Sequence, residues 1–322
     1  MLQGHMRAGI WASVLVASLI GAPPSEADDY PARPITMIVP YPPGGGVDLI
    51  GRLVAQKLTA ALGQQVIVEN RGGAGGVIGT RDLAKAAPDG YTIGIGASGN
   101  SLSADPGYDV NKDFSPIGLI ASTPIILVAH PSFPAKSLAD VIALAKTQPG
   151  KLMAGTPPAP TMNYFAAQLF NQAAGVDVTV VTYKGTAPLT NDLLGNHVPL
   201  GFDTIPAAVS NVQAGQLRAI AVTGTTRSAA LPDVPTTAEA GLPALEAVIY
   251  YGLTAPAGVP RPIIDRLNKE LRTMLTDQDF KTHLVSVGDD PAPTTPEEYA
   301  ENIKREEARW AALAAKLGLK IE

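Results

Sequence analysis

The stretch ITMIVPYPPGGGVD, residues 35–48, decides how this chain folds. Ile35–Val39 is a short β-branched run that ends at Pro40, which predicts a strand. Beyond the loop, Asp48–Leu62 places its apolar residues Leu49, Ile50, Leu53, Val54, Leu58 and Leu62 on one face of a predicted helix. A strand that leads through a glycine-rich loop into a helix is the opening unit of an α/β fold.

The same alternation continues along the chain. Short apolar runs predict further strands at Val66–Val68, Thr92–Ile95, Ile125–Ala129, Val178–Val181 and Arg218–Thr223. Helices are predicted to start at Ser137, Thr161 and Pro206, and near the C-terminus one apolar stripe joins Tyr299, Ile303, Trp310, Leu313 and Leu317. We therefore expect an α/β protein with mostly parallel sheets, in which ligands bind beyond the carboxyl ends of the strands.

Composition narrows the possible functions. The 322 residues suggest about two domains. A net charge of −5 without a basic stripe argues against nucleic acid as a partner. The chain has no cysteine, and its four histidines lack metal-ligand spacing, so we expect no metal and no cofactor. The 32 glycines and 29 prolines indicate many turns and closely approached backbone.

The N-terminus has the pattern of an export signal. Arg7 precedes the apolar run Ala8–Ile20, and Ser25-Glu26-Ala27 offers a cleavage site. We expect residues 1–27 to be a signal peptide, with a retained N-terminal anchor as the alternative. No later segment has 18 uninterrupted apolar residues, so the mature protein is expected to be soluble in the periplasm.

The first glycine loop suits an anion. Residues 44–46 have no side chains, so their N–H groups can face a ligand, and the following helix adds the positive end of its dipole. Because no Gly-Lys-Ser/Thr follows, the loop is not a P-loop, and a carboxylate fits it better. Asp48 is interpreted as a helix-capping acid rather than a catalytic one.

Other strand-end loops are less specific. For the second glycine cluster, residues 71–79, we favour tight turning and helix–sheet packing, and no dinucleotide fingerprint is present. Three further loops also lie at the ends of predicted elements. Residues 97–101 follow a predicted strand, residues 155–161 precede a predicted helix, and residues 183–187 follow a predicted strand. Each is compatible with an ordinary capped turn, but together with the first loop they indicate a binding site.

Several motifs together resemble one family. Residues 30–35 with 39–48, then 70–79, 89–92, 113–117, 181–187, 194–203, 218–235 and 252–260 are similar to the extracytoplasmic solute receptors of the tripartite tricarboxylate transporter family, the Bug-type receptors. This resemblance implies a periplasmic-binding-protein type II-like fold, with two α/β lobes that close on a small carboxylate by bending near Ser122–Ile126 and Ile249–Leu253. It implies lobe 1 from residues 28–124 plus 249–322 and lobe 2 from 125–248.

The resemblance also implies a role and a site. A monomeric receptor would deliver a di- or tricarboxylate, or an aromatic carboxylate, to the integral membrane permease of a tripartite tricarboxylate-type transporter. Backbone donors of the first loop and of the region around Thr161 would bind one carboxylate, while the contact of Lys184 and the role of Asp203 stay open. The expected ligand-binding residues are Tyr41, Gly44, Gly45, Gly46, Val47, Asp48, Ser98, Asn100, Thr156, Pro158, Thr161, Tyr164, Tyr183, Lys184, Gly185, Thr186 and Asp203.

The chain departs from the family in two places. Relatives have Gly-Asn-Gly-Thr-Pro-Ser-His where this chain has PAPTMNY, residues 158–164, and the segment between Asn100 and Tyr108 is shorter than usual. The first change removes glycine donors and adds apolar bulk. We therefore hypothesise a larger or less polar distal pocket that accepts an aromatic or longer-chain carboxylate.

Two alternative functions remain from the sequence. A periplasmic hydrolase acting on a carboxylate-containing substrate would pair Ser98 or Ser101 with His130 or His197, but Ser98 lacks the Gly-x-Ser-x-Gly pattern of a nucleophile elbow. A receptor that passes its ligand to a sensor kinase has the same sequence features as one that serves a permease. We expect no enzyme activity.

Overall fold

The structure is a computed structural model that describes residues 30–97, 106–316 and 318. Strands and helices alternate through most of this part of the chain, which confirms the predicted α/β class. The strands are β1 (Ile35–Val39), β2 (Val66–Asn70), β3 (Thr92–Ala97), β4 (Phe114–Ala129), β5 (Met153–Thr156), β6 (Thr179–Thr182), β7 (Leu200–Thr204), β8 (Arg218–Val222), β9 (Val248–Pro256) and β10 (Asp290–Pro291). The helices are α1 (Gly46–Leu62), the short 3₁₀ helix η1 (Ala74–Gly76), α2 (Val77–Ala84), α3 (Leu138–Thr147), α4 (Met162–Ala174), α5 (Thr186–Leu194), α6 (Ile205–Gln213), α7 (Arg261–Thr276), α8 (Gln278–Val287) and α9 (Pro296–Lys316).

The main path of the sheet has the order β2-β1-β3-β9-β4-β7-β5-β6. At one end β1 pairs in parallel with β2 and β3, and at the other end β5 pairs in parallel with β6 and β7. In the middle β9 is antiparallel to both β3 and β4. Two parallel α/β units are thus joined by antiparallel central strands. The expectation of mostly parallel sheets was therefore right for the two units and wrong for the strands β4 and β9 that join them.

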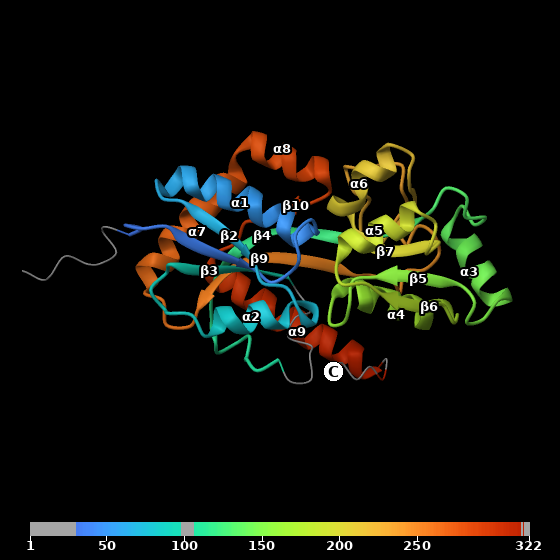
Figure 1. Ribbon diagram of the computed structural model, residues 1–322, viewed down its shortest axis with the longest axis horizontal. Helices are drawn as coiled ribbons and strands as arrows, with labels where there is room; N and C mark the ends of the chain where they lie inside the picture. Colours follow the sequence, from blue (N-terminus) through green and yellow to red (C-terminus); the bar gives the residue numbers. More distant parts are fainter. Residues whose placement is uncertain (1–29, 98–105, 317, 319–322) are drawn as a thin grey trace, which may run out of the picture.

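The long strand β4 changes partners along its length. Phe114–Pro124 pairs with β9, whereas Ile125–Ala129 pairs with β7 and β8. Figure 1 shows β1–β3 with α1, α2, α7 and α8 on one side, here named the first lobe, and β5–β7 with α3–α6 on the other, the second lobe. The partner change lies where the lobe boundary is expected, and bending of β4 and β9 at this place stays a prediction.

Helix α1 begins immediately after the first glycine loop, at Gly46, two residues before the predicted start. Its buried face includes Ile50, Val54 and Leu58, and the helix ends where Gly63 adopts the left-handed conformation with φ 69°. The prediction for Leu49 was wrong, since this side chain is 45% exposed. The spacing of apolar residues assigns Leu49 to the buried face of the helix, but a residue at the edge of that face remains partly exposed.

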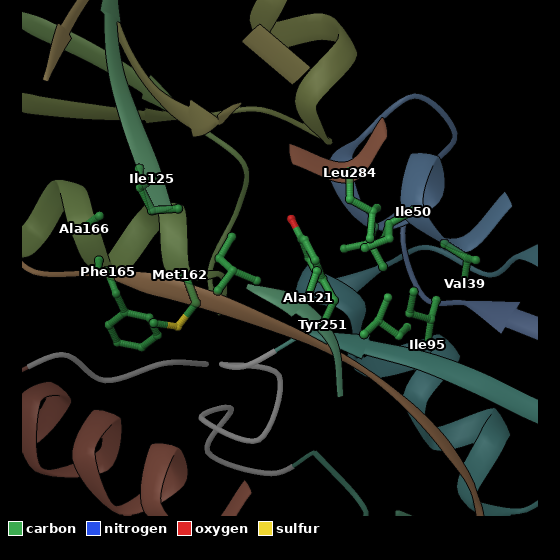
Figure 2. Packing of buried hydrophobic residues seen from close by; sticks show 14 of the residues in the cluster. Val39, Ile50, Ile95, Ala121, Ile125, Met162, Phe165, Ala166, Tyr251 and Leu284 are labelled. Carbon is green, nitrogen blue, oxygen red and sulfur yellow. The ribbon is translucent and has the colours of Figure 1, made fainter. Parts of the chain in front are cut away.

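One large hydrophobic core extends through both lobes, and a smaller one lies in the second lobe. Figure 2 shows Tyr251 of β9 between Met162 and Phe165 on one side and Ile50 and Ile95 on the other. The central strand therefore carries an aromatic residue to the place where the lobes meet.

The C-terminal helix α9 contacts the second lobe as well as the first. The ring of Trp310, which is buried, packs against Phe165 of α4 with 6.0 Å between the ring centroids. Arg309 forms an ion pair with Glu246 at 3.0 Å. Residues 249–322 were expected to belong to lobe 1. Helix α9 lies within this range, and its residues Arg309 and Trp310 also contact residues outside lobe 1.

Candidate functional site

A cavity of about 680 Å³ lies between the lobes. The first lobe contributes the loop after β1 and the second glycine cluster, the second lobe contributes the loops before α4 and α5, and β9 contributes two side chains. Its volume is within the range of small-molecule sites, about 300–1,000 Å³. The lining residues are Tyr41, Pro42, Pro43, Gly45, Gly46, Val47, Asn70, Gly72, Gly73, Ala74, Gly75, Gly76, Ala97, Pro157, Pro158, Thr161, Met162, Asn163, Lys184, Gly185, Thr186, Thr204, Ile249 and Tyr251.

Five helices of the described part of the chain begin at this cavity. The N-cap residues of α1, α2, α4, α5 and α6 all line it, and they are Gly45, Gly76, Thr161, Gly185 and Thr204. Each helix start carries unsatisfied N–H groups and the positive end of the helix dipole. The arrangement therefore favours an anion.

Most of these helix starts have no side-chain cap. No side-chain hydrogen bond caps α1, α2, α5 or α6. Away from the cavity, α3 and α8 are capped by Ser137 and Asp277, whereas α7, which follows Pro260, also has no side-chain cap. At α4, Thr161 Oγ1 accepts a long hydrogen bond of 3.4 Å from Tyr164 N and donates to Pro158 O at 2.7 Å. The free N–H groups are therefore concentrated at α1 and α5, because Val77 N and Ile78 N at the start of α2 donate to Ala74 O and Gly73 O, and Pro206 near the start of α6 has no N–H.

The charge of the lining is low. Among the described lining residues, Lys184 is the single cationic side chain and no carboxylate is present. Lys184 is itself exposed to solvent. Backbone dipoles rather than ionised side chains thus produce most of the attraction for an anion in this cavity.

A buried carboxylate holds the first glycine loop in place. Asp48 accepts hydrogen bonds from Gly44 N at 2.9 Å, Arg52 Nε at 3.1 Å and Asn70 Nδ2 at 2.8 Å. Asn70 Nδ2 also donates to Tyr41 O at 3.0 Å, so both ends of the loop are fixed. Burial alone would raise the pKa of Asp48, but the bonds from Arg52, Gly44 and Asn70 outweigh it and hold the pKa below its usual value. Asp48 thus positions the loop.

Asp203 is fully buried beside the cavity and does not line it. Burial raises its pKa from 3.8 to about 7, partly offset by hydrogen bonds from Thr204 N and from the Thr186 hydroxyl. This acid therefore joins the end of β7 to the start of α5.

The lobes touch at glycines. A β-carbon on Gly75 would lie 2.5 Å from Pro160 Cδ, and one on Gly185 would lie 3.4 Å from Pro42 Cγ. A β-carbon on Gly45 would lie 3.5 Å from Thr186 Oγ1. The loops around the cavity are therefore in contact across the cleft, and at Gly75 this contact leaves no room for a side chain.

Nine of the seventeen expected residues line the cavity: Tyr41, Gly45, Gly46, Val47, Pro158, Thr161, Lys184, Gly185 and Thr186. Ser98 and Asn100 lie outside the described residues. The remaining six, Gly44, Asp48, Thr156, Tyr164, Tyr183 and Asp203, do not line it.

These six residues lie outside the cavity lining and have other hydrogen-bond or packing partners. Gly44 N bonds to Asp48, as described above. Thr156 Oγ1 donates to Pro157 O at 2.6 Å, and Tyr183 Oη donates to Asp192 Oδ2 at 2.9 Å. The ring of Tyr164 packs edge-on to Phe165. These residues support the loops from behind rather than facing the cavity.

Sequence reasoning missed three groups of lining residues. The second glycine cluster was interpreted as turns and packing, which holds for Gly79, where a β-carbon would lie 2.4 Å from Arg71 O. However, residues 72–76 of that cluster also line the cavity. Met162 and Asn163 follow the expected Thr161. The third group was not expected at the site and contains Pro42, Pro43, Asn70, Ala97, Pro157, Thr204, Ile249 and Tyr251.

Comparison with known proteins identifies the family. Residues 50–319 match the model of the tripartite tricarboxylate transporter family receptor. The chain belongs to this family. The receptor is 36% identical to protein BugT of Bordetella pertussis over 315 residues, which cover 96% of this chain and 97% of BugT.

Solved structures agree with this assignment. The receptor is similar to the R. palustris protein Rpa4515, solved with adipate, with a TM-score of 0.87 and 34% identity over 90% of this chain and 99% of that one. It is also similar to MatC of Rhodopseudomonas palustris, solved with malate, with a TM-score of 0.83 and 31% identity over 88% of this chain and 99% of that one. The expected periplasmic-binding-protein fold is thereby confirmed.

The hydrolase alternative gains no support from the described residues. Neither His130 nor His197 lines the cavity. The Nδ1 atom of His130 lies 2.7 Å from Ser132 Oγ in an exposed turn. Both histidines thus stand away from the place where a substrate would bind, and Ser98 and Ser101 lie outside the part of the chain that the structure describes.

Proposed function

We propose that this receptor binds a small carboxylate in the cavity between its lobes, chiefly through the N–H groups at helix starts, and retains it by lobe closure. The convergence of five helix N-caps on one cavity carries the proposal. Each helix start contributes about 0.3–1 kcal/mol toward an anion, and up to about 2 kcal/mol where the site is partly buried. Several acting together suffice without a pair of arginines.

The ligand class follows from the rest of the lining. Pro42, Pro43, Pro157, Pro158, Met162 and Ile249 present apolar surface. Lys184 supplies one positive charge at the solvent-exposed side. The two relatives solved with adipate and malate are dicarboxylate complexes. We infer that the preferred ligand has a longer or aromatic body between one carboxylate held by helix starts and a second polar group near Lys184.

The cellular role extends the same proposal. The receptor works in the periplasm as a monomer, after cleavage of a signal peptide near Ala27, and delivers its ligand to a tripartite tricarboxylate-type permease. Residues 1–27 lie outside the described part. In the portion that is described, every helix is too short or too polar to cross a bilayer. Delivery to a sensor kinase is the competing role, and it requires the same ligand site.

A thermal-shift panel on the mature protein tests the ligand class. Succinate, malate, citrate, adipate, benzoate and 4-hydroxybenzoate are compared at 100-fold excess over Kd, where a ligand adds about 2.7 kcal/mol of stability. We expect adipate or an aromatic acid to give the largest shift. A response to short dicarboxylates alone overturns the long-ligand inference, and a flat response to all six overturns the carboxylate proposal. Turnover of an ester or amide would revive the hydrolase alternative.

A further inference from the structure

Two buried hydroxyls at the cavity have no hydrogen-bond partner. Among the described residues, Thr204 Oγ1 and Tyr251 Oη are side-chain atoms fully shielded from solvent and left without a donor or acceptor, and both residues line the cavity. We name Thr204 and Tyr251 the hydroxyl pair. Native proteins rarely leave such groups unpaired, because an unpaired buried polar atom lowers stability.

The hydroxyl pair converges on the start of α1. A β-carbon on Gly46 would lie 2.8 Å from Tyr251 Oη and 3.0 Å from Thr204 Oγ1. Gly46 is the first residue of α1, directly after the uncapped N-cap Gly45. Both hydroxyls therefore stand beside the first residue of α1, the helix to whose start the carboxylate proposal assigns an anion.

The side chain of Thr204 does not cap the helix that it precedes. It is the N-cap of α6, where a threonine side chain usually accepts a hydrogen bond from the second or third residue of the helix. Here the second residue is Pro206, which has no N–H, and no side-chain cap is formed. The hydroxyl is instead directed to Gly46 across the lobe boundary.

The hydroxyl of Tyr251 stays protonated and can therefore donate a hydrogen bond. It lies on β9, fully buried, and burial together with the nearby Asp289, Tyr41 and Asp203 raises the pKa of its hydroxyl well above the usual value. The group therefore keeps its proton at any physiological pH. A buried hydroxyl that stays protonated and has no acceptor in the protein is suited to an acceptor on a ligand.

We propose that the hydroxyl pair donates to a carboxylate oxygen of the ligand beside the first turn of α1. The proposal rests on the proposed function and refines it. One carboxylate then contacts the first lobe through α1, the second lobe through Thr204 and the central strand β9 through Tyr251. Binding of an acceptor at this point links all three parts of the fold, so these two side chains couple recognition to closure.

Two substitutions test this proposal. Tyr251→Phe and Thr204→Val each remove one hydroxyl with little change of shape. Each variant is titrated calorimetrically with the tightest binder of the six-acid panel, and its thermal unfolding is measured without ligand. We expect affinity to fall about 10- to 100-fold in each, as for a hydrogen bond to a charged group, while the melting temperature without ligand stays the same or rises.

Matched controls separate binding from structure. Tyr30→Phe removes a buried hydroxyl that donates to Gly90 O, and Thr223→Val removes one that is bonded to Ala247 O and Ile125 O. These controls should melt at a lower temperature and bind with unchanged affinity.

If Tyr251→Phe and Thr204→Val bind as tightly as wild type, the hydroxyl pair has no role in binding and the proposal is overturned. If they melt lower without ligand, the pair is structural, which also overturns it. If wild-type protein binds none of the six acids, the proposed function fails as well.

Discussion

Gly75 of the first lobe lies directly against Pro160 of the second, so closely that a β-carbon on Gly75 would stand 2.5 Å from Pro160 Cδ. Gly75 also has a left-handed backbone with φ 63°. Both facts require glycine here, and they give the second glycine cluster a place in the contact between the lobes as well as in a turn. This contact therefore depends on the absence of a side chain at this position.

Gly75→Asn should weaken ligand binding by about 10-fold or more, because asparagine tolerates the left-handed backbone but its side chain would separate the lobes. The matched control is Gly63→Asn, at φ 69° with nothing within 4 Å of a β-carbon. Calorimetric titration should show reduced affinity for the first variant alone. Equal affinities would mean that contact at Gly75 does not contribute to closure.

Gly45→Asp should abolish carboxylate binding, with affinity reduced by more than about 100-fold, since like charges placed together cost several kcal/mol. Gly45 has φ −88° and ψ 167°, which any residue adopts, and an aspartate at an N-cap is favourable for the helix. The melting temperature without ligand should therefore not fall. Gly45→Ala, which adds no charge, should retain most of the binding; comparable losses in both variants would point to steric blockage instead of charge.

Asp48→Ala should destabilise the protein by about 1–3 kcal/mol, because Gly44 N and Asn70 Nδ2 lose a buried acceptor. It should also lower ligand affinity, since the first glycine loop is no longer fixed in its binding conformation. Urea unfolding and titration measure the two effects. Asp265→Ala, which breaks an exposed pair with Arg261, should change stability by less than about 0.5 kcal/mol. A similar small effect at Asp48 would remove its positioning role.

Asp203 gives the protein a pH-dependent stability. Its pKa is about 7 in the folded state against 3.8 ordinarily, so the folded state binds more protons than the unfolded state between these values. The free energy of unfolding therefore falls as pH rises through this window, by up to about 1.4 kcal/mol per pH unit from this group. Asp203→Asn mimics the protonated acid and should remove that component.

Urea unfolding of both proteins at intervals between about pH 4 and 8 provides the check. The variant should gain stability relative to wild type as pH rises. The pKa values of Asp289 and Asp290 are also raised by burial, but these groups are present in both proteins. A stability difference that does not change with pH would show that Asp203 is ionised throughout.

The first loop was the most predictable part of the site. A strand followed by consecutive glycines and an apolar helical stripe is a local pattern, and Gly45, Gly46 and Val47 do line the cavity. The start of α1 was placed two residues late because glycines at 44–46 were all assigned to the loop. The local sequence therefore predicted the loop and the helix but not the residue at which the helix begins.

Other features depend on contacts between distant segments. β4 was predicted only as Ile125–Ala129, because Pro116 and Pro124 interrupt the apolar pattern of a strand that runs from Phe114. The hydroxyl pair could not be predicted, since Thr204 and Tyr251 become neighbours of Gly46 only when both lobes and β9 are assembled. Pairing across a sheet leaves no signal in the spacing of residues along one chain.

The most direct test of the central claim compares an acid with its uncharged analogue. The mature wild-type protein is titrated calorimetrically with the tightest binder of the six-acid panel and with the amide of that acid, which keeps the shape of the ligand and removes its negative charge. We expect saturable binding of the acid and no measurable binding of the amide, because helix starts and a lysine attract an anion. Binding of both with similar affinity, or of the amide alone, would contradict the proposal.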